Sequence, residues 1–127
     1  MIAKNITELI GNTPMIELKM KNNDWKVYLK LEKFNPGGSM KDRMALNMIN
    51  QAEKDGKLKP GGTIIESSSG NTAIGLAIAS AIKGYKFIAV VDHHASKEKI
   101  DMIKAYGGNI VVVGDGYKDC LLYTSPS

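Results

Sequence analysis

Hydrophobic residues recur along the chain with two different periods. Residues 26–32 alternate apolar and polar positions, which predicts a β-strand, and the short apolar segment 15–18 predicts another. In 40–55, 71–83 and 97–106 the apolar residues instead recur every three or four positions, as on one face of an α-helix. The residues expected on the buried faces of these helices are Ala45, Met48, Ile49, Ala52, Ile74, Ala77, Ile78, Ala81, Ile82, Ile100 and Ile103.

Three further segments predict strands between these helices. The runs 87–91 and 110–113 are continuously apolar, and 63–66 follows a Pro-Gly-Gly turn. Strands with two apolar faces, separated by amphipathic helices, are typical of a covered parallel sheet. The sequence therefore predicts the α/β class: a Rossmann-like parallel sheet with helices on both faces. A short helix over 6–10 is predicted to precede these elements.

Composition narrows the class of protein. The 127 residues amount to one domain or part of one, and 43% hydrophobic with 24% charged residues excludes disorder. No apolar run approaches the roughly 20 residues of a membrane helix, and no signal-peptide core is present. We therefore expect a cytoplasmic protein with no membrane partner. The 17 basic and 13 acidic residues are scattered, which favours small anions over nucleic acid as partners.

Metal binding is not expected. Cys120 is the single cysteine, so a disulfide framework and a metal finger are excluded. His93 and His94 are adjacent, and neighbouring side chains of an extended segment point in different directions. We interpret 92–94 as the loop that follows a strand.

The segment 120–127 differs from the rest of the chain. Its sequence, CLLYTSPS, resembles the translation of a sequencing adapter. We expect it to be a non-native tail on a truncated chain and leave it out of fold reasoning. A genuine short C-terminal tail is the alternative.

Lys41 is the first candidate for chemistry. It follows the loop 35–38 and lies in the first turn of a predicted helix, with Ser39 as N-cap and Asp42 in the capping-box position. Peptide dipoles at a helix N-terminus disfavour an ammonium group and lower its pKa, which suits an amine that forms a Schiff base. A solvated surface lysine is the alternative. A phosphate-binding P-loop is excluded because Met40 precedes and Asp42 follows the lysine.

A second polar loop leaves a strand and begins a helix. Hydroxyls and backbone N–H groups at a helix N-terminus form an anion site, and a carboxylate fits this loop better than a pyrophosphate. A loop that only caps its own helix is the alternative. The candidate binding residues are Ser68, Ser69, Gly70, Asn71 and Thr72.

Three segments together resemble one enzyme family. The segments 10–14 (IGNTP), 30–43 (KLEKFNPGGSMKDR) and 66–72 (ESSSGNT) are similar in order and spacing to those of the cysteine synthase and cystathionine β-synthase family. These are fold type II enzymes dependent on pyridoxal 5'-phosphate (PLP). The resemblance implies that Lys41 is catalytic and binds PLP covalently. It implies that Asn71 hydrogen-bonds to the 3′ oxygen of the pyridine ring, and that Ser68 to Thr72 bind the substrate carboxylate.

The resemblance also implies a reaction and an assembly. The expected activity is β-replacement on an O-activated L-serine, either O-acetylserine or O-phosphoserine, with sulfide addition that forms L-cysteine. The partners would be a small amino-acid substrate and, for the parent protein, a second copy in a homodimer. Residues 1–44 would belong to the larger PLP domain and 45–119 to a small mobile α/β domain. The family's phosphate cup lies further along the chain, so the chain by itself is expected to be inactive.

Departures from the family pattern keep other functions open. Ser67, Ser68 and Ala73 replace the usual proline, threonine and glycine of the second loop, and 91–96 is unusual. These changes resemble a divergent subgroup that includes the siderophore enzyme making N-(2-amino-2-carboxyethyl)-glutamate. A serine/threonine dehydratase-like lyase and a non-catalytic Rossmann-like binding module are the remaining alternatives.

Overall fold

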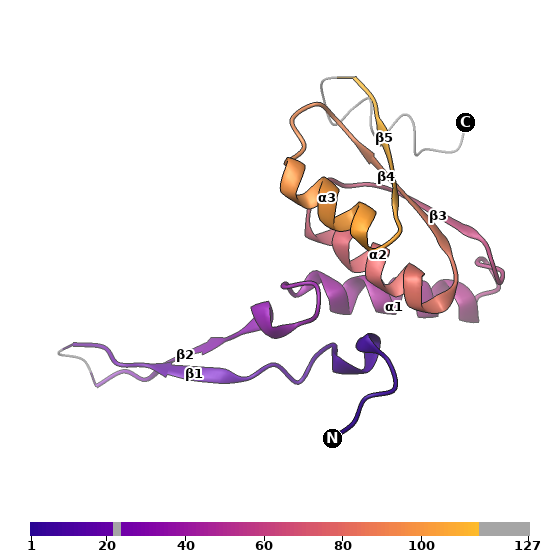
Figure 1. Ribbon diagram of the computed structural model, residues 1–127. Coiled ribbons are helices and arrows are strands. Elements are labelled where there is room, and N and C mark those ends of the chain that lie inside the picture. Colours follow the sequence, from indigo (N-terminus) through magenta and orange to yellow (C-terminus); the bar gives the residue numbers. More distant parts are fainter. Residues whose placement is uncertain (22–23, 115–127) are drawn as a thin grey trace.

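The computed structural model describes residues 1–21 and 24–114. The first part of the chain forms a two-stranded antiparallel hairpin that extends away from the rest (Figure 1). All eight residues of its two strands are exposed. The elements of this part are η1 (Ile6–Leu9), β1 (Met15–Leu18), β2 (Val27–Lys30) and η2 (Glu32–Phe34).

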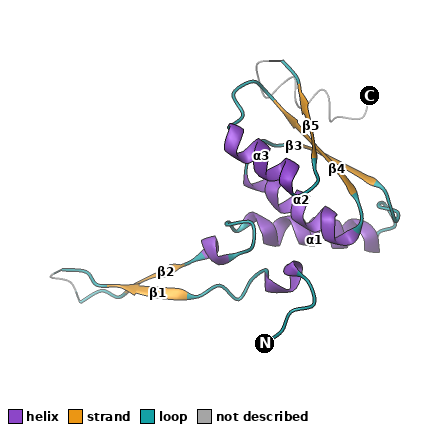
Figure 2. Ribbon diagram, viewed as in Figure 1, coloured by secondary structure: helices purple, strands orange, loops and turns teal. Residues whose placement is uncertain are grey.

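The second part is a parallel sheet with helices packed on it (Figure 2). The sheet order is β3-β4-β5, and two helices connect these strands. Helix α2 contacts β3 and β4, while α3 contacts β5 and α2, so both lie on the same face. Helix α1 packs against α2. The bounds are α1 (Lys41–Lys54), β3 (Thr63–Ser67), α2 (Asn71–Lys83), β4 (Lys86–Val91), α3 (Lys97–Ala105) and β5 (Asn109–Val112).

The predicted α/β class with a parallel sheet and helices is confirmed. The expectation of helices on both faces is not met within the described residues, because α2 and α3, which contact the sheet, lie on the same face. Strand β4, which is apolar after Lys86, lies in the middle of the sheet, where four of its six residues are buried. On the face opposite α2, Ile65 of β3 remains 45% exposed. Within the described ranges, no helix is long and apolar enough to cross a membrane.

The predicted buried faces are confirmed for most of their residues and wrong for three, Met48, Ala81 and Ile82. Residues 73–80 of α2 are all buried, because α2 lies between the sheet and the two other helices. Ala81 and Ile82 in its last turn are exposed, contrary to the prediction. Met48 is also exposed, at 44%, because α1 contacts α2 along a narrow face that contains Ala45.

The predicted cap of α1 is wrong. Met40 occupies the N-cap position and makes no side-chain capping bond. The Ser39 hydroxyl accepts a hydrogen bond from the Lys41 N–H at 3.1 Å, two residues along the chain, whereas a capping box requires a bond from the third residue. Asp42 accepts from the Gly37 N–H instead of reaching back to Ser39. The predicted cap of α3 is confirmed, since Ser96 accepts from its first turn.

Two predictions about chain organisation are not tested. The segment 120–127 lies outside the described residues. The division of the chain into 1–44 and 45–119 stays a prediction, and residue 44 lies within α1.

Candidate active site

Gly75 brings the two candidate loops together. A Cβ atom at this position would lie 3.1 Å from the Ala45 Cβ and 3.1 Å from the Lys41 carbonyl oxygen. Only a glycine therefore lets the first turn of α1 approach α2 this closely. One helical turn separates Gly75 from Asn71, where α2 begins. The structure thus places the N-terminal turn that carries Lys41 beside the N-terminal turn that follows the serine-rich loop.

Lys41 is partly buried, and its side chain is available for chemistry. Its backbone N–H donates to Ser39, but its ammonium group makes no hydrogen bond or ion pair with another described residue. An amine that is not held in an ion pair can approach and react with an aldehyde. This observation supports the predicted role of Lys41.

The Glu32 carboxylate is the centre of a hydrogen-bond network formed by residues of the first two resemblance segments. The Arg43 guanidinium donates through Nε to Oε2 of Glu32 at 2.9 Å and through Nη2 to Oε1 at 3.0 Å. The Thr13 hydroxyl donates to the same carboxylate at 2.6 Å, and the Asn35 amide donates at 2.9 Å. The Asn35 side-chain oxygen in turn accepts from the Gly11 N–H at 2.8 Å. The first two resemblance segments are therefore joined by hydrogen bonds.

The pKa values of the Glu32 and Asp42 carboxyl groups are shifted in opposite directions. The hydrogen bonds from Arg43, and then from Thr13, lower the pKa of Glu32 to about 2. Burial raises the pKa of Asp42, and the bond from the Gly37 N–H only partly offsets this. Asp42 is 1% exposed, and its Oδ1 atom has no hydrogen-bond partner among the described residues.

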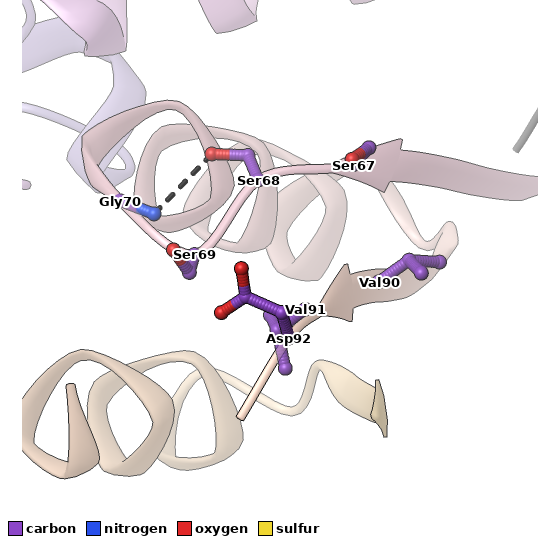
Figure 3. A pocket seen from close by; sticks show the side chains of 7 residues that line it. All are labelled: Ser67, Ser68, Ser69, Gly70, Val90, Val91 and Asp92. Atoms are coloured by element: carbon purple, nitrogen blue, oxygen red, sulfur yellow. Dashed lines mark hydrogen bonds between the residues drawn. The ribbon is translucent and has the colours of Figure 1, made fainter. Parts of the chain in front are cut away.

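The second loop borders a pocket of about 240 Å³ at the carboxyl ends of β3 and β4. The Gly70 N–H donates to the Ser68 hydroxyl at 3.3 Å, and Asp92 extends from the end of β4 toward Ser69 (Figure 3). Gly70 is the N-cap of α2 and provides no side-chain acceptor. The N–H groups in the first turn of α2 therefore have no capping side chain, which suits an anionic ligand. The residues that line the pocket are Ser67, Ser68, Ser69, Gly70, Val90, Val91 and Asp92.

The structure distributes the predicted carboxylate-binding residues between two locations. Ser68, Ser69 and Gly70 line the pocket, whereas Asn71 and Thr72 begin α2 and do not line it. Their role as a set stays a prediction. The Asn71 side chain is exposed, and its oxygen accepts from the Lys99 ammonium group at 3.4 Å.

Sequence reasoning missed three single residues and one ion pair around this site. Asp92 was assigned only to a loop, and Lys99 and Gly75 were not singled out. The pairing of Glu32 with Arg43 was also missed, although both residues lie within the resemblance segment 30–43. The only sequence signal for Lys99 was its position three residues after the Ser96 cap.

The described residues fit the reactive end of PLP. Lys41 provides a primary amine without a partner for the aldehyde, and Asn71 provides an exposed amide for the neighbouring ring oxygen. Among the described residues, no cluster of three or more His, Cys, Asp or Glu side chains could hold a metal ion.

The Glu32 network predicts a specific dependence of stability on pH. A carboxylate with a pKa near 2 in the folded state and 4.5 in the unfolded state stabilises folding above pH 4.5. This contribution is lost as the pH falls from about 4.5 to about 2. In urea unfolding of the full-length protein, we expect Glu32→Gln to be less stable than wild type at pH 6 and the difference to shrink toward pH 3. Arg43→Met should give the same pattern, and a difference that grows on acidification would contradict the assignment.

Comparison with known proteins supports the resemblance in sequence. A family model described as "Pyridoxal-phosphate dependent enzyme" matches residues 6–125. A cysteine synthase of Staphylococcus aureus is 51% identical over 110 residues, which are 85% of this chain and 36% of that protein. A putative cysteine synthase of Sinorhizobium fredii is 50% identical over 119 residues, covering 94% of this chain and 35% of its own length.

Solved structures agree with this result. A hydrogen sulfide-producing enzyme from Fusobacterium nucleatum superposes with a TM-score of 0.93 at 42% identity and covers 97% of this chain and 41% of its own. The crystal structure of O-ureido-L-serine synthase gives a TM-score of 0.83 at 45% identity, covering 88% and 36% of the two chains. The chain thus spans a little more than a third of the length of its relatives. Because the family model matches most of its residues, the chain belongs to the pyridoxal-phosphate dependent enzyme family, as a relative of the cysteine synthases.

Proposed function

We propose that the full-length protein catalyses β-replacement on an O-activated L-serine, with sulfide as the nucleophile and L-cysteine as the product. The observation that carries this proposal is the close approach at Gly75, which packs the first turn of α1, with Lys41, against the helix that follows the loop of hydroxyls and uncapped N–H groups. The Lys41 amine has no partner among the described residues. A family relationship at about 50% identity to cysteine synthases supports the choice of reaction.

Different residues of this chain would carry out proton transfer and substrate binding. PLP, when bound through its aldehyde to Lys41, supplies an electron-accepting ring. The Lys41 amine would accept the proton from the substrate Cα. Ser68, Ser69 and the first N–H groups of α2 bind and orient the substrate carboxylate. Asn71 would contact the cofactor ring oxygen.

One observation favours an alternative nucleophile in place of sulfide. The relative named O-ureido-L-serine synthase is 45% identical to this chain, which shows that similar N-terminal sequences occur in enzymes that make different β-substituted products. The unusual segment 91–96 contributes Asp92 to the pocket. A product of the N-(2-amino-2-carboxyethyl)-glutamate type is therefore the alternative, with L-glutamate as the nucleophile.

Assays that combine two activated serines with two nucleophiles test the proposal. Full-length protein with PLP is incubated with O-acetyl-L-serine or O-phospho-L-serine, each with sulfide or with L-glutamate, and products are identified by mass spectrometry. We expect cysteine from sulfide and no pyruvate beyond the uncatalysed level. Product from L-glutamate alone would support the siderophore-type alternative, and pyruvate without a nucleophile would support a lyase. No product and no PLP binding would leave only a binding module.

Three further features are proposed with this activity. The parent protein would be a cytoplasmic homodimer, and Lys41 would be its covalent attachment point for PLP. The 127-residue chain would be inactive by itself, since it spans about 36% of the cysteine synthases that it matches.

A further inference from the structure

The two residues that follow Lys41 are both anchored to the loop before it. Asp42 accepts a hydrogen bond from the Gly37 N–H and is 1% exposed. A Cβ atom at Gly37 would overlap the Asp42 carboxylate, so the loop lies directly on this side chain. Arg43 points to the other side and binds Glu32. The side-chain contacts of Asp42 and Arg43 therefore hold the backbone directly after Lys41.

The anchor at Arg43 is the more extensive one. The guanidinium and carboxylate form two parallel hydrogen bonds, at 2.9 and 3.0 Å, which fix direction as well as distance. Thr13 and Asn35 bind the same carboxylate from other sides, so Glu32 cannot change rotamer without breaking several bonds. The Arg43 side chain also lies close to Gly11, where a Cβ atom would be 2.9 Å from Nη1.

We infer that Glu32 is a positioning residue for Lys41: by holding Arg43, it sets the conformation in which α1 begins and so the direction of the Lys41 amine. The inference rests on the proposed function. Glu32 itself touches neither Lys41 nor the pocket in the contacts of the described residues. Its effect on the chemistry would pass through Arg43, its bidentate partner.

A second network on α1 provides a matched control. Glu53, in the last turn of α1, accepts hydrogen bonds from the Lys83 ammonium at 2.9 Å and from the Tyr85 hydroxyl at 2.7 Å. It joins α1 to the end of α2, far along the helix from Lys41. Glu53→Gln therefore removes a similar set of interactions from the same helix without disturbing its first turn.

The test measures the covalent reaction at Lys41 directly. Full-length protein is freed of PLP, mixed with PLP and quenched with borohydride at timed intervals. The Lys41 amine and the PLP aldehyde form a carbon–nitrogen double bond and release water. Borohydride then adds hydride to the carbon and solvent adds a proton to the nitrogen, which leaves a stable secondary amine. Mass spectrometry of the Lys41 peptide gives the rate of labelling, and thermal unfolding of the PLP-free protein is measured in parallel.

We expect Glu32→Gln to slow labelling by about tenfold or more, because small misplacements of a reacting group are costly. Glu53→Gln should lower the unfolding temperature similarly and leave labelling within about twofold of wild type. In an Arg43→Met background, Glu32→Gln should have little further effect on labelling. Arg43→Lys keeps the positive charge but cannot form the two parallel hydrogen bonds to Glu32, so it provides a milder variant if Glu32→Gln fails to fold.

Two results would overturn the inference. Labelling of Glu32→Gln at the wild-type rate would exclude a positioning role. Equal slowing in Glu32→Gln and Glu53→Gln would show that both carboxylates act through stability alone. If wild-type Lys41 is not labelled at all, the proposed function fails rather than this inference.

Discussion

Lys41→Ala in the full-length protein is expected to reduce the rate of β-replacement by about 10³-fold or more. The substitution removes the amine that we propose forms the covalent bond to PLP and accepts the Cα proton. No neighbouring described side chain can replace it, because the residues after it, Asp42 and Arg43, are anchored to the preceding loop. The measurement is kcat/KM with O-acetyl-L-serine and sulfide.

The matched control for this variant is Lys104→Ala, which removes an exposed lysine from the last turn of α3. It should retain wild-type kinetics and the visible absorption of covalently bound PLP, while Lys41→Ala loses that absorption. Lys41→Arg should be nearly as inactive as Lys41→Ala, since a guanidinium remains protonated and forms no Schiff base. Normal turnover by either Lys41 variant would refute its assignment as the catalytic residue.

Gly75→Val is expected to destabilise the full-length protein by about 1–3 kcal/mol and to weaken PLP attachment. Its Cβ would lie 3.1 Å from the Ala45 Cβ, 3.1 Å from the Lys41 carbonyl oxygen and 3.3 Å from the Asp42 Cα. Two of these atoms belong to the backbone of α1 and the third is a Cβ atom, so none of them can rotate away. The first turn of α1 must therefore move away from α2, and Lys41 moves with it.

Urea unfolding and the borohydride labelling rate measure these two effects. Ala81→Val is the control, because it introduces the same β-branched side chain at an exposed position of the same helix. We expect this control to change stability by less than about 0.5 kcal/mol and to leave labelling unchanged. Equal effects of the two valines would show that helix propensity, and not the close approach at Gly75, limits stability.

The secondary structure could be predicted closely because its signals are local. The apolar runs 87–91 and 110–113 differ by one residue from β4 and β5. Ser96 caps α3 as predicted because its bond reaches only three residues along the chain. The cap of α1 could not be predicted in this way, since the buried Asp42 carboxylate binds the Gly37 N–H in preference to its own helix.

The residues of the candidate site could be identified from the sequence, but their arrangement in space could not. Lys41 and the loop 68–72 were identified by helix-start signals and by resemblance. Their proximity depends on Gly75, which looks in sequence like an unfavourable residue in a helix interior. The division of the loop between the pocket and the start of α2 likewise follows from the position of β4 beside β3.

Periodicity by itself determined the class of fold and the order of its elements, because each of these depends on residues a few positions apart. Motif spacing and the family resemblance selected Lys41 as the candidate lysine. The tertiary structure decided what surrounds that lysine. Glu32 and Arg43 are 11 residues apart, and Thr13 and Arg43 are 30 apart. Contacts at such separations exist only after the chain has folded, since side-chain geometry and burial select them and no local pattern encodes them.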